Sequence, residues 1–192
     1  MADSRVPPPA ALPPDDPRRT LTHVHADRSP GVAHIALAGD TYTILVAGAD
    51  TAGRYCLIDM FVPHDGGPPP HRHDFEEMFT ILEGEIEFTF RGRTVRAVEG
   101  DTVNIPANAP HSFRNASGRP ARMLCMCTPA GQDEFFREVG TVVAGRTAPP
   151  PARTPEEEAE TRRKAAELAP SYRTELPLEP TSPPPTSSGR AG

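Results

Sequence analysis

The middle of this chain consists of short apolar runs that end at regular intervals in turn residues. The 192-residue sequence contains β-branched and aromatic runs such as HIALAG, TYTILV, IEFTF and TVNIP, separated by AGD, RGR and EGD. Runs of this length bounded by Gly or Asp predict strands, so we expect roughly eight or nine strands between residues 34 and 130. Such spacing, with no long helix between the strands, predicts an all-β sandwich or barrel.

The two ends of the chain differ in composition from the middle. Of the 25 prolines, 17 lie within residues 1–30 and 149–192. Proline-rich polar segments cannot bury enough apolar surface to fold. We therefore predict a disordered proline-rich arm over 1–30, a single β domain over 34–130, and a disordered tail over 179–192.

Between the β domain and the tail, residues 131–178 predict a helical extension. GQDEFFREVG would place Phe135, Phe136 and Val139 on one side of a short helix that ends at a glycine. TPEEEAETRRKAAELAP predicts a second, solvated helix. Thr154 can cap it, Pro155 suits its first turn, and acidic residues favour its positive end.

Charge and cysteine content narrow the class of protein. The net charge of −6 argues against a nucleic-acid partner, which would favour a basic face. No apolar run approaches 18 residues, and the N-terminus lacks the basic and apolar regions of a signal peptide, so we expect no membrane span and a cytoplasmic location. The three cysteines do not suggest a disulfide framework. Cys125 and Cys127 would share one strand face, and buried reduced thiols are favoured over a metal or redox role.

The stretch PPPHRHDFEEMFTILEGE, residues 68–85, concentrates ionisable groups in an apolar segment. Read as one strand, it turns His71, His73 and Glu77 to the same face, because side chains alternate with a period of two. The same face carries Phe75, Phe79 and Ile81, whereas the opposite face begins with Arg72, Asp74 and Glu76. Burying an unpaired carboxylate is costly, and a divalent cation would offset that cost. Parity therefore favours Glu77 over Glu76 as a metal ligand.

A third imidazole can come from GDTVNIPANAPHSFRN, in which His111 opens a strand after a proline-rich turn. Three imidazoles and one carboxylate leave one or two exchangeable positions on a six-coordinate ion. Such an open site can bind water, dioxygen or a chelating substrate.

These residues carry a family resemblance that covers roughly residues 35–130. HxH-x3-E-x6-G, formed by His71, His73, Glu77 and Gly84, resembles the first motif of the cupins, with the leading glycine at Gly66 or Gly67. The second motif is matched by Gly100, Pro106, His111 and Asn115, with Asn108 in place of the middle glycine. Asn tolerates positive φ, so we expect the turn to survive.

The resemblance implies a single-domain cupin jelly-roll barrel (double-stranded β-helix) of the quercetin-dioxygenase-like group. It implies one divalent transition metal held by His71, His73, Glu77 and His111. Fe or Mn is favoured, and Ni, Co, Cu and Zn stay open. It also implies that Glu77 acts as a catalytic base. Three apolar residues would either wall a substrate pocket or simply pack in the core: Phe79, Phe113 and Met123.

The implied function is oxidation of a small oxygenated aromatic, flavonol-like or polyketide-like compound by dioxygen. Two alternatives stay open: a redox-neutral isomerase, cyclase or lyase, and a non-enzymatic module that binds a small molecule. A homodimer through sheet edges is compatible with the resemblance.

The other histidines favour plainer interpretations. His23 and His25 lie in the proline-rich arm, and we expect both to be solvated. His34 precedes a strand and is expected at its edge. His64 would lie in a loop or near the mouth of the site.

Overall fold

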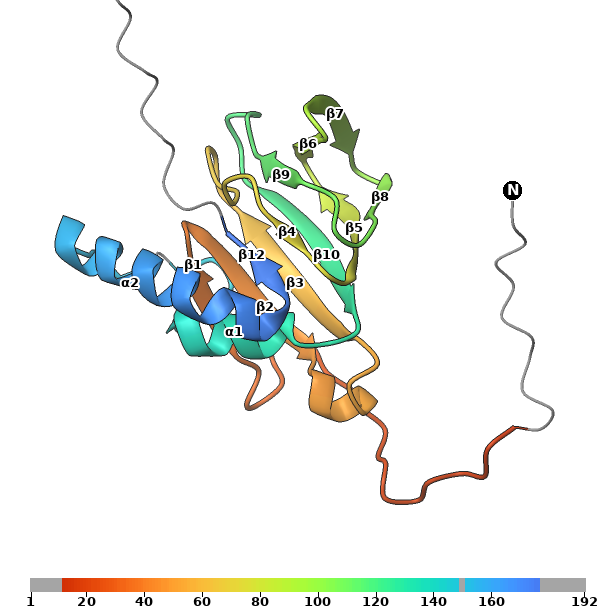
Figure 1. Cartoon of the computed structure of the whole chain (residues 1–192). Helices are drawn as coiled ribbons and strands as arrows, with labels where there is room; N and C mark the ends of the chain where they lie inside the picture. The colour runs from red at the N-terminus through yellow and green to blue at the C-terminus, as the bar shows by residue number, and fades with distance from the viewer. Residues whose placement is uncertain (1–11, 149–150, 177–192) are drawn as a thin grey trace, which may run out of the picture.

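The computed structural model describes residues 12–148 and 151–176 (Figure 1). This part of the chain contains twelve strands, two α-helices and two short 3-10 helices. The strands are β1 His34–Leu37, β2 Asp40–Val46, β3 Cys56–Val62, β4 Arg72–His73, β5 Glu76–Glu83, β6 Glu85–Phe90, β7 Arg93–Val98, β8 Thr102–Ile105, β9 His111–Arg114, β10 Ala121–Thr128, β11 Thr141–Val142 and β12 Thr174–Glu175. The helices are η1 Gly48–Thr51, α1 Gln132–Val139, α2 Pro155–Leu168 and η2 Ala169–Tyr172.

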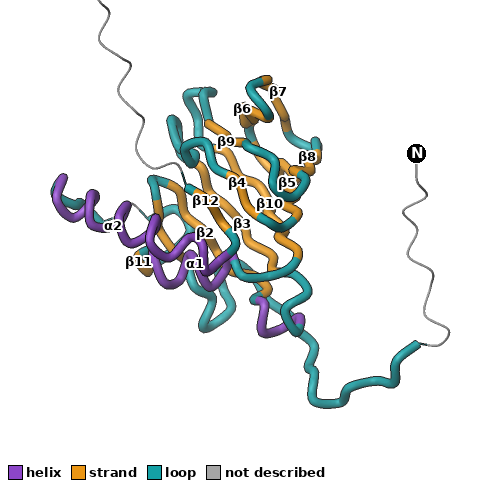
Figure 2. The backbone as a smooth tube through the Cα atoms, viewed as in Figure 1, coloured by secondary structure: helices purple, strands orange, loops and turns teal. Residues whose placement is uncertain are grey.

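The strands form a jelly-roll barrel from two main sheets. The larger sheet has the order β11-β1-β2-β3-β10-β5-β8, and the smaller sheet has the order β7-β6-β9. Figure 2 shows the long strands of the larger sheet side by side, with the β6–β7 hairpin and β9 beyond them. The chain crosses between the sheets at Gly84, between β5 and β6. The all-β class is therefore confirmed, with ten strands between His34 and Thr128.

Alternation of buried and accessible residues builds the core. In β5 and β10, every second residue is buried, including Phe79, Ile81 and Met123. Phe88 of β6 and Phe113 of β9 approach from the smaller sheet, with ring centroids 5.2 and 5.6 Å from that of Phe79. Each of these strands thus contributes side chains of one parity to the interior, as the period of two predicts.

The prediction of one continuous strand through the HRHDFEE stretch is wrong. The chain forms β4 at Arg72–His73, bends at residues 74 and 75, and then forms β5 from Glu76. The bend has its own partners: the Asp74 amide donates to the Arg173 carbonyl at 2.8 Å, and the His73 carbonyl accepts from the Asn108 amide at 2.7 Å. Pairing with distant segments therefore redirects the strand, yet His73 and Glu77 both still face inward.

Two turns that frame this stretch need unusual backbone conformations. Gly67 has φ +128°, and a Cβ placed there would lie 2.1 Å from the Phe113 carbonyl oxygen. Only glycine fits such a close approach. Asn108 has φ +65°, so the predicted tolerance of Asn in place of glycine is confirmed.

The C-terminal extension packs against the barrel and then returns to it. Helix α1 buries Phe135, Phe136 and Val139, as predicted, with the Phe136 ring centroid 3.9 Å from that of Tyr42. Helix α2 begins at a capping box in which Thr154 Oγ1 accepts from the Glu157 amide. It buries only Ala165, so the prediction of a mostly solvated helix holds.

Strand β12 then pairs antiparallel with β4, with Thr174 opposite His73. No helix in the described residues is long and apolar enough to cross a bilayer.

The described part of the arm, residues 12–30, contains no helix or strand. It is joined to the rest of the molecule by an ion pair between Asp27 and Arg146 at 3.0 Å. Residues 1–11 and the predicted tail over 179–192 lie outside the described residues. The domain boundaries stay predictions.

The turn at Asn108 predicts a specific ranking of variants. Asn108→Gly and Asn108→Ala both remove the amide that donates to Asp74 Oδ1 at 3.1 Å. Only alanine adds the cost of left-handed backbone, roughly 1 kcal/mol. We expect Asn108→Ala to be less stable than Asn108→Gly by about this amount in chemical denaturation. Equal stability of the two variants would show that backbone strain at this turn is negligible.

A buried carboxyl makes stability depend on pH. Asp40 is 0% exposed, and burial raises its pKa to about 8, against a smaller opposing effect of the Tyr42 hydroxyl at 3.5 Å. A raised carboxyl pKa favours folding below its unfolded value, and this contribution is lost as pH rises toward 8. We therefore expect the melting temperature of Asp40→Asn, relative to the parent protein, to rise between about pH 4 and pH 8, the window set by the two pKa values. Asp15→Asn, at an exposed position in the arm, is the control and should show no such trend.

Candidate metal centre

Three separate segments bring the four predicted ligands together. His71 lies just before β4, His73 within it, Glu77 at the second position of β5, and His111 at the start of β9. His71 and His111 form an isolated antiparallel bridge in which each amide donates to the other carbonyl at 2.9 Å. Backbone pairing therefore places residues 40 positions apart in sequence directly opposite one another.

The donor atoms of this group converge on one point. One ligand atom from each of His71, His73, Glu77 and His111 lies within 4.8 Å of the others. Glu77 Oε2 lies 3.0 Å from His73 Nε2 and 3.2 Å from His111 Nε2. The side chains of His73 and His111 are 1% and 0% exposed. His71 is the least buried residue of the four, so the site lies nearest to solvent on its side.

The remaining imidazole nitrogens are fixed by the backbone. His71 Nδ1 donates to the Pro69 carbonyl at 2.9 Å, His73 Nδ1 to the Phe75 carbonyl at 3.0 Å, and His111 Nδ1 to the Ala109 carbonyl at 2.9 Å. A carbonyl can only accept, so each Nδ1 carries the proton. Nε2 is then the ring nitrogen left to bind a metal, and this arrangement is typical of metal-binding histidines.

Charge separation inside the cluster shifts its pKa values in opposite directions. Burial acts to raise the pKa of Glu77, but the hydrogen-bonded His111 and His73 rings outweigh it and the net shift is downward. Burial acts to lower the pKa of His111, and the Glu77 carboxylate outweighs it, so this pKa rises. Burial and then the neighbouring His111 lower the pKa of His71 to about 4. The carboxylate is therefore the stable form of Glu77 in this site.

The donor set fits a divalent transition metal. Lone pairs of His73 Nε2 and His111 Nε2 face an anionic oxygen, a contact that is repulsive unless a proton or a cation lies between the atoms. Two ligands that bind an ion at about 2.1 Å and at a right angle are about 3.0 Å apart, close to the distances from Glu77 Oε2. Imidazole and carboxylate together suit Fe, Mn, Co, Ni, Cu or Zn.

A cluster of thiols lies on the opposite side of the carboxylate. Cys125 Sγ donates to Glu77 Oε1 at 3.3 Å and Cys127 Sγ at 3.8 Å, and the two sulfurs are 3.6 Å apart. The Cys127 thiol acts to lower the pKa of Cys125, but burial and the Glu77 charge outweigh it and raise this pKa to about 12. Strand parity predicted that both thiols share a face, but their position beside Glu77 depends on the pairing of β10 with β5, which strand parity alone does not predict.

Other candidate residues lie elsewhere. Glu76 accepts from Asn104 Nδ2 at 3.0 Å and from the Ala107 amide at 3.1 Å, away from the histidines. His34 Nδ1 is 2.8 Å from Thr43 Oγ1 at the start of β1. His64 is in a loop, with its side chain 52% exposed. His23 and His25 lie in the arm, outside the cluster.

Asn115 of the second motif has a structural role in the described chain. It is 0% exposed, and its Nδ2 donates to the carbonyls of Val62 at 2.9 Å and Arg119 at 2.7 Å. Its Oδ1 accepts from the Ser117 hydroxyl at 2.7 Å. The amide thus ties together the loops that follow β3 and β9.

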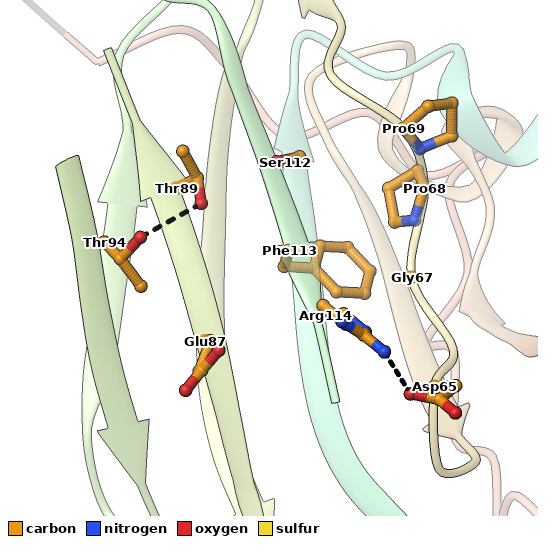
Figure 3. Close-up of a pocket in the computed structure, with 10 residues that line it drawn as sticks. All are labelled: Asp65, Gly67, Pro68, Pro69, Glu87, Thr89, Thr94, Ser112, Phe113 and Arg114. Atoms are coloured by element: carbon orange, nitrogen blue, oxygen red, sulfur yellow. Dashed lines mark hydrogen bonds and ion pairs between the residues drawn. The ribbon is translucent and has the colours of Figure 1, made fainter. Parts of the chain in front are cut away.

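The predicted pocket residues divide between core and cavity. Phe79 and Met123 are 1% and 0% exposed, whereas Phe113 lines a cavity of about 490 Å³. Figure 3 shows this cavity between the β6–β7 hairpin and the segment from Asp65 to Pro69, with the Phe113 ring directed toward Gly67. A role of Phe79, Phe113 and Met123 in substrate binding stays a prediction.

A second cavity of about 470 Å³ lies against β4 and the C-terminal extension. Its lining includes His73, Asn108 and Arg173. The first cavity touches none of the four clustered residues. Of the four, the second cavity touches His73, whose side chain is 1% exposed.

Fold and site together define a class of protein. Residues 58–127 match the family model described as "Cupin domain". With the jelly-roll barrel and the two motifs, this match identifies residues 58–127 as a cupin domain.

Each alignment with a known relative covers only part of this chain and part of the relative. The chain is 29% identical over 115 residues to quercetin 2,3-dioxygenase of Bacillus subtilis, an alignment that covers 59% of this chain and 34% of the relative. It is 36% identical over 132 residues to the dimethylsulfoniopropionate lyase DddQ of Ruegeria pomeroyi, covering 56% of this chain and 63% of the relative. The chain thus spans less than two thirds of the length of either protein.

Among solved structures, the polyketide cyclase RemF from Streptomyces resistomycificus is similar with a TM-score of 0.50. The match has 21% sequence identity and covers 77% of this chain and 97% of that chain. At this identity the likeness concerns the fold.

Because the four donor atoms converge, variants that remove one of them should lose metal affinity. We expect protein purified without chelator to hold about one divalent ion per chain. His73→Ala and Glu77→Gln should each weaken metal affinity by at least about 10-fold, because each removes a donor from a buried site. Plasma emission analysis and titration with a chromophoric chelator measure both quantities.

Glu76→Gln, next to Glu77 in β5, and His34→Ala, in β1, are the matched controls. Each changes the same residue type outside the cluster, and metal binding should be unchanged. Equal metal loss in the controls would contradict the assignment of the site.

Proposed function

We propose that this chain is a metal-dependent cupin enzyme that oxidises a small oxygenated aromatic compound with dioxygen. The observation that carries the proposal is the convergence of three Nε2 lone pairs and one carboxylate oxygen in a buried space. His71, His73, Glu77 and His111 would hold the ion, with Fe or Mn favoured. Bound there, the metal would supply Lewis acidity toward a substrate oxygen and a binding position for dioxygen.

Glu77 is the residue that we assign to proton transfer. Its Oε2 faces the metal side of the site, so it can accept a proton from a substrate hydroxyl that approaches this side. The surrounding histidines keep it ionised, as a base requires. Its side chain is 7% exposed, which excludes most bulk water from the transferred proton.

Apolar surroundings support an aromatic substrate. The Phe75 ring stacks on the His73 ring with centroids 3.8 Å apart, and Phe113 lies two residues after His111 in β9. The similarity to quercetin 2,3-dioxygenase supports flavonol-like compounds as the first class to test. A small-molecule substrate, a cytoplasmic location and a homodimer are part of this proposal.

A redox-neutral reaction is the second candidate. The similarity to a dimethylsulfoniopropionate lyase extends over 132 residues at higher identity than the similarity to the dioxygenase. The same base and metal could remove a proton next to a carbonyl or carboxylate and promote elimination or cyclisation without dioxygen. A binding module without turnover is the third candidate.

Oxygen consumption separates these candidates. We expect the metal-loaded protein to consume dioxygen in proportion to substrate loss when flavonols and catechols are screened with an oxygen electrode. His73→Ala should reduce uptake to background because it removes a metal ligand, and His34→Ala should keep the parent rate. Dimethylsulfoniopropionate and polyketide-like compounds belong in the same screen, with product detection by mass spectrometry.

Substrate loss that proceeds equally without dioxygen would replace the dioxygenase by the redox-neutral candidate. Tight binding of a compound without turnover, under any metal, would favour the binding module.

A further inference from the structure

The thiols of Cys125 and Cys127 contact the Glu77 oxygen that faces away from the histidines. In the antiparallel pairing of β10 with β5, Cys127 is directly opposite Glu77, and Cys125 is opposite Phe79. Both cysteines are at most 1% exposed. Directly opposite residues point to the same face of a sheet, so the thiols lie inside the barrel next to the carboxylate.

The two carboxylate oxygens therefore have different partners. Oε2 lies 3.0 and 3.2 Å from the imidazole nitrogens of His73 and His111. Oε1 accepts from the thiols at 3.3 and 3.8 Å. Rotation of the carboxylate would break both sets of contacts at once.

We propose that Cys125 and Cys127 are positioning residues of the metal centre, which hold Glu77 so that only Oε2 is presented to the metal. The inference rests on the metal centre of the proposed function. A neutral thiol is a weak donor, so it orients the carboxylate while withdrawing little of its negative charge. A lysine or arginine in the same place would orient Glu77 equally well but would compete with the metal for its charge.

Removal of the thiols should loosen Glu77 without removing a ligand. In a Cys125→Ala/Cys127→Ala variant, Oε1 loses both donors in a buried space, and the carboxylate can rotate toward a second oxygen contact with the metal. Partners that orient a ligand typically contribute about 10- to 100-fold to metal affinity. We expect a loss of this size for Co(II), measured by competition with a chromophoric chelator.

A second readout reports geometry directly. The visible ligand-field absorption of the Co(II)-loaded protein depends on coordination number and symmetry, so it should change in the double alanine variant. Cys125→Ser/Cys127→Ser keeps a hydrogen-bond donor at each position and should retain the parent affinity more closely than the alanine pair.

Cys56→Ala is the matched control. Cys56 is 0% exposed and is paired with Cys127 in the register of β10 with β3. Within the described chain, the thiols that bond to Glu77 are those of Cys125 and Cys127. Cys56→Ala therefore creates a similar small cavity in the same core, and it should leave Co(II) affinity and absorption unchanged.

Four results would overturn the inference. The first is a double alanine variant that matches Cys56→Ala in affinity and absorption. The second is an intense sulfur-to-cobalt charge-transfer band that disappears in Cys125→Ala, because it would show the thiol bound to the metal itself. The third is a serine pair as weak as the alanine pair. The fourth is parent protein that binds no Co(II), which would also remove the proposed metal centre.

If circular dichroism shows that the double alanine variant does not fold, the single Cys125→Ala variant, which removes the nearer thiol, is compared with Cys56→Ala instead. The same measurements of Co(II) affinity and absorption apply.

Discussion

Three hydrogen bonds from histidine Nδ1 atoms to backbone carbonyls are the interaction on which the rest of this site depends. They involve Pro69, Phe75 and Ala109, each two residues from the histidine that it fixes. With every Nδ1 proton committed to the backbone, the three Nε2 lone pairs must point elsewhere, and they point toward one buried carboxylate. Local backbone geometry thus orients a set of ligand atoms that a cation can bind.

The C-terminal extension is part of the framework that holds this geometry. Beyond α2, residues 173–175 run along β4, with the Arg173 carbonyl accepting from the Asp74 amide and Thr174 opposite His73. On the other side, the His73 carbonyl accepts from the Asn108 amide. The segment that carries His73 is therefore held from two directions by residues far away in sequence. A role for the extension in shaping the site follows from this arrangement, although its sequence predicted only two helices, the second of them solvated.

Much of the site could be predicted from sequence because its geometry is local. Alternation by two places Glu77 inside and Glu76 outside, and Asn108 adopts the positive φ that the motif requires. Helices α1 and α2 form where cap residues and apolar spacing indicated. The break between β4 and β5 could not be predicted in this way, since it arises from hydrogen bonds to Asn108 and Arg173, whose proximity exists only in the folded chain.

The sequence by itself determined the fold class, the four candidate ligands and the side of the strand on which each lies, because strand periodicity and turn chemistry act over a few residues. Only the tertiary structure decided which strands are neighbours. Strand β10 pairs with β5 rather than with another strand, and this register places two thiols against Glu77 Oε1. This pairing follows from closing the barrel around one core. Long-range packing, and not local preference, selects which strands become partners there.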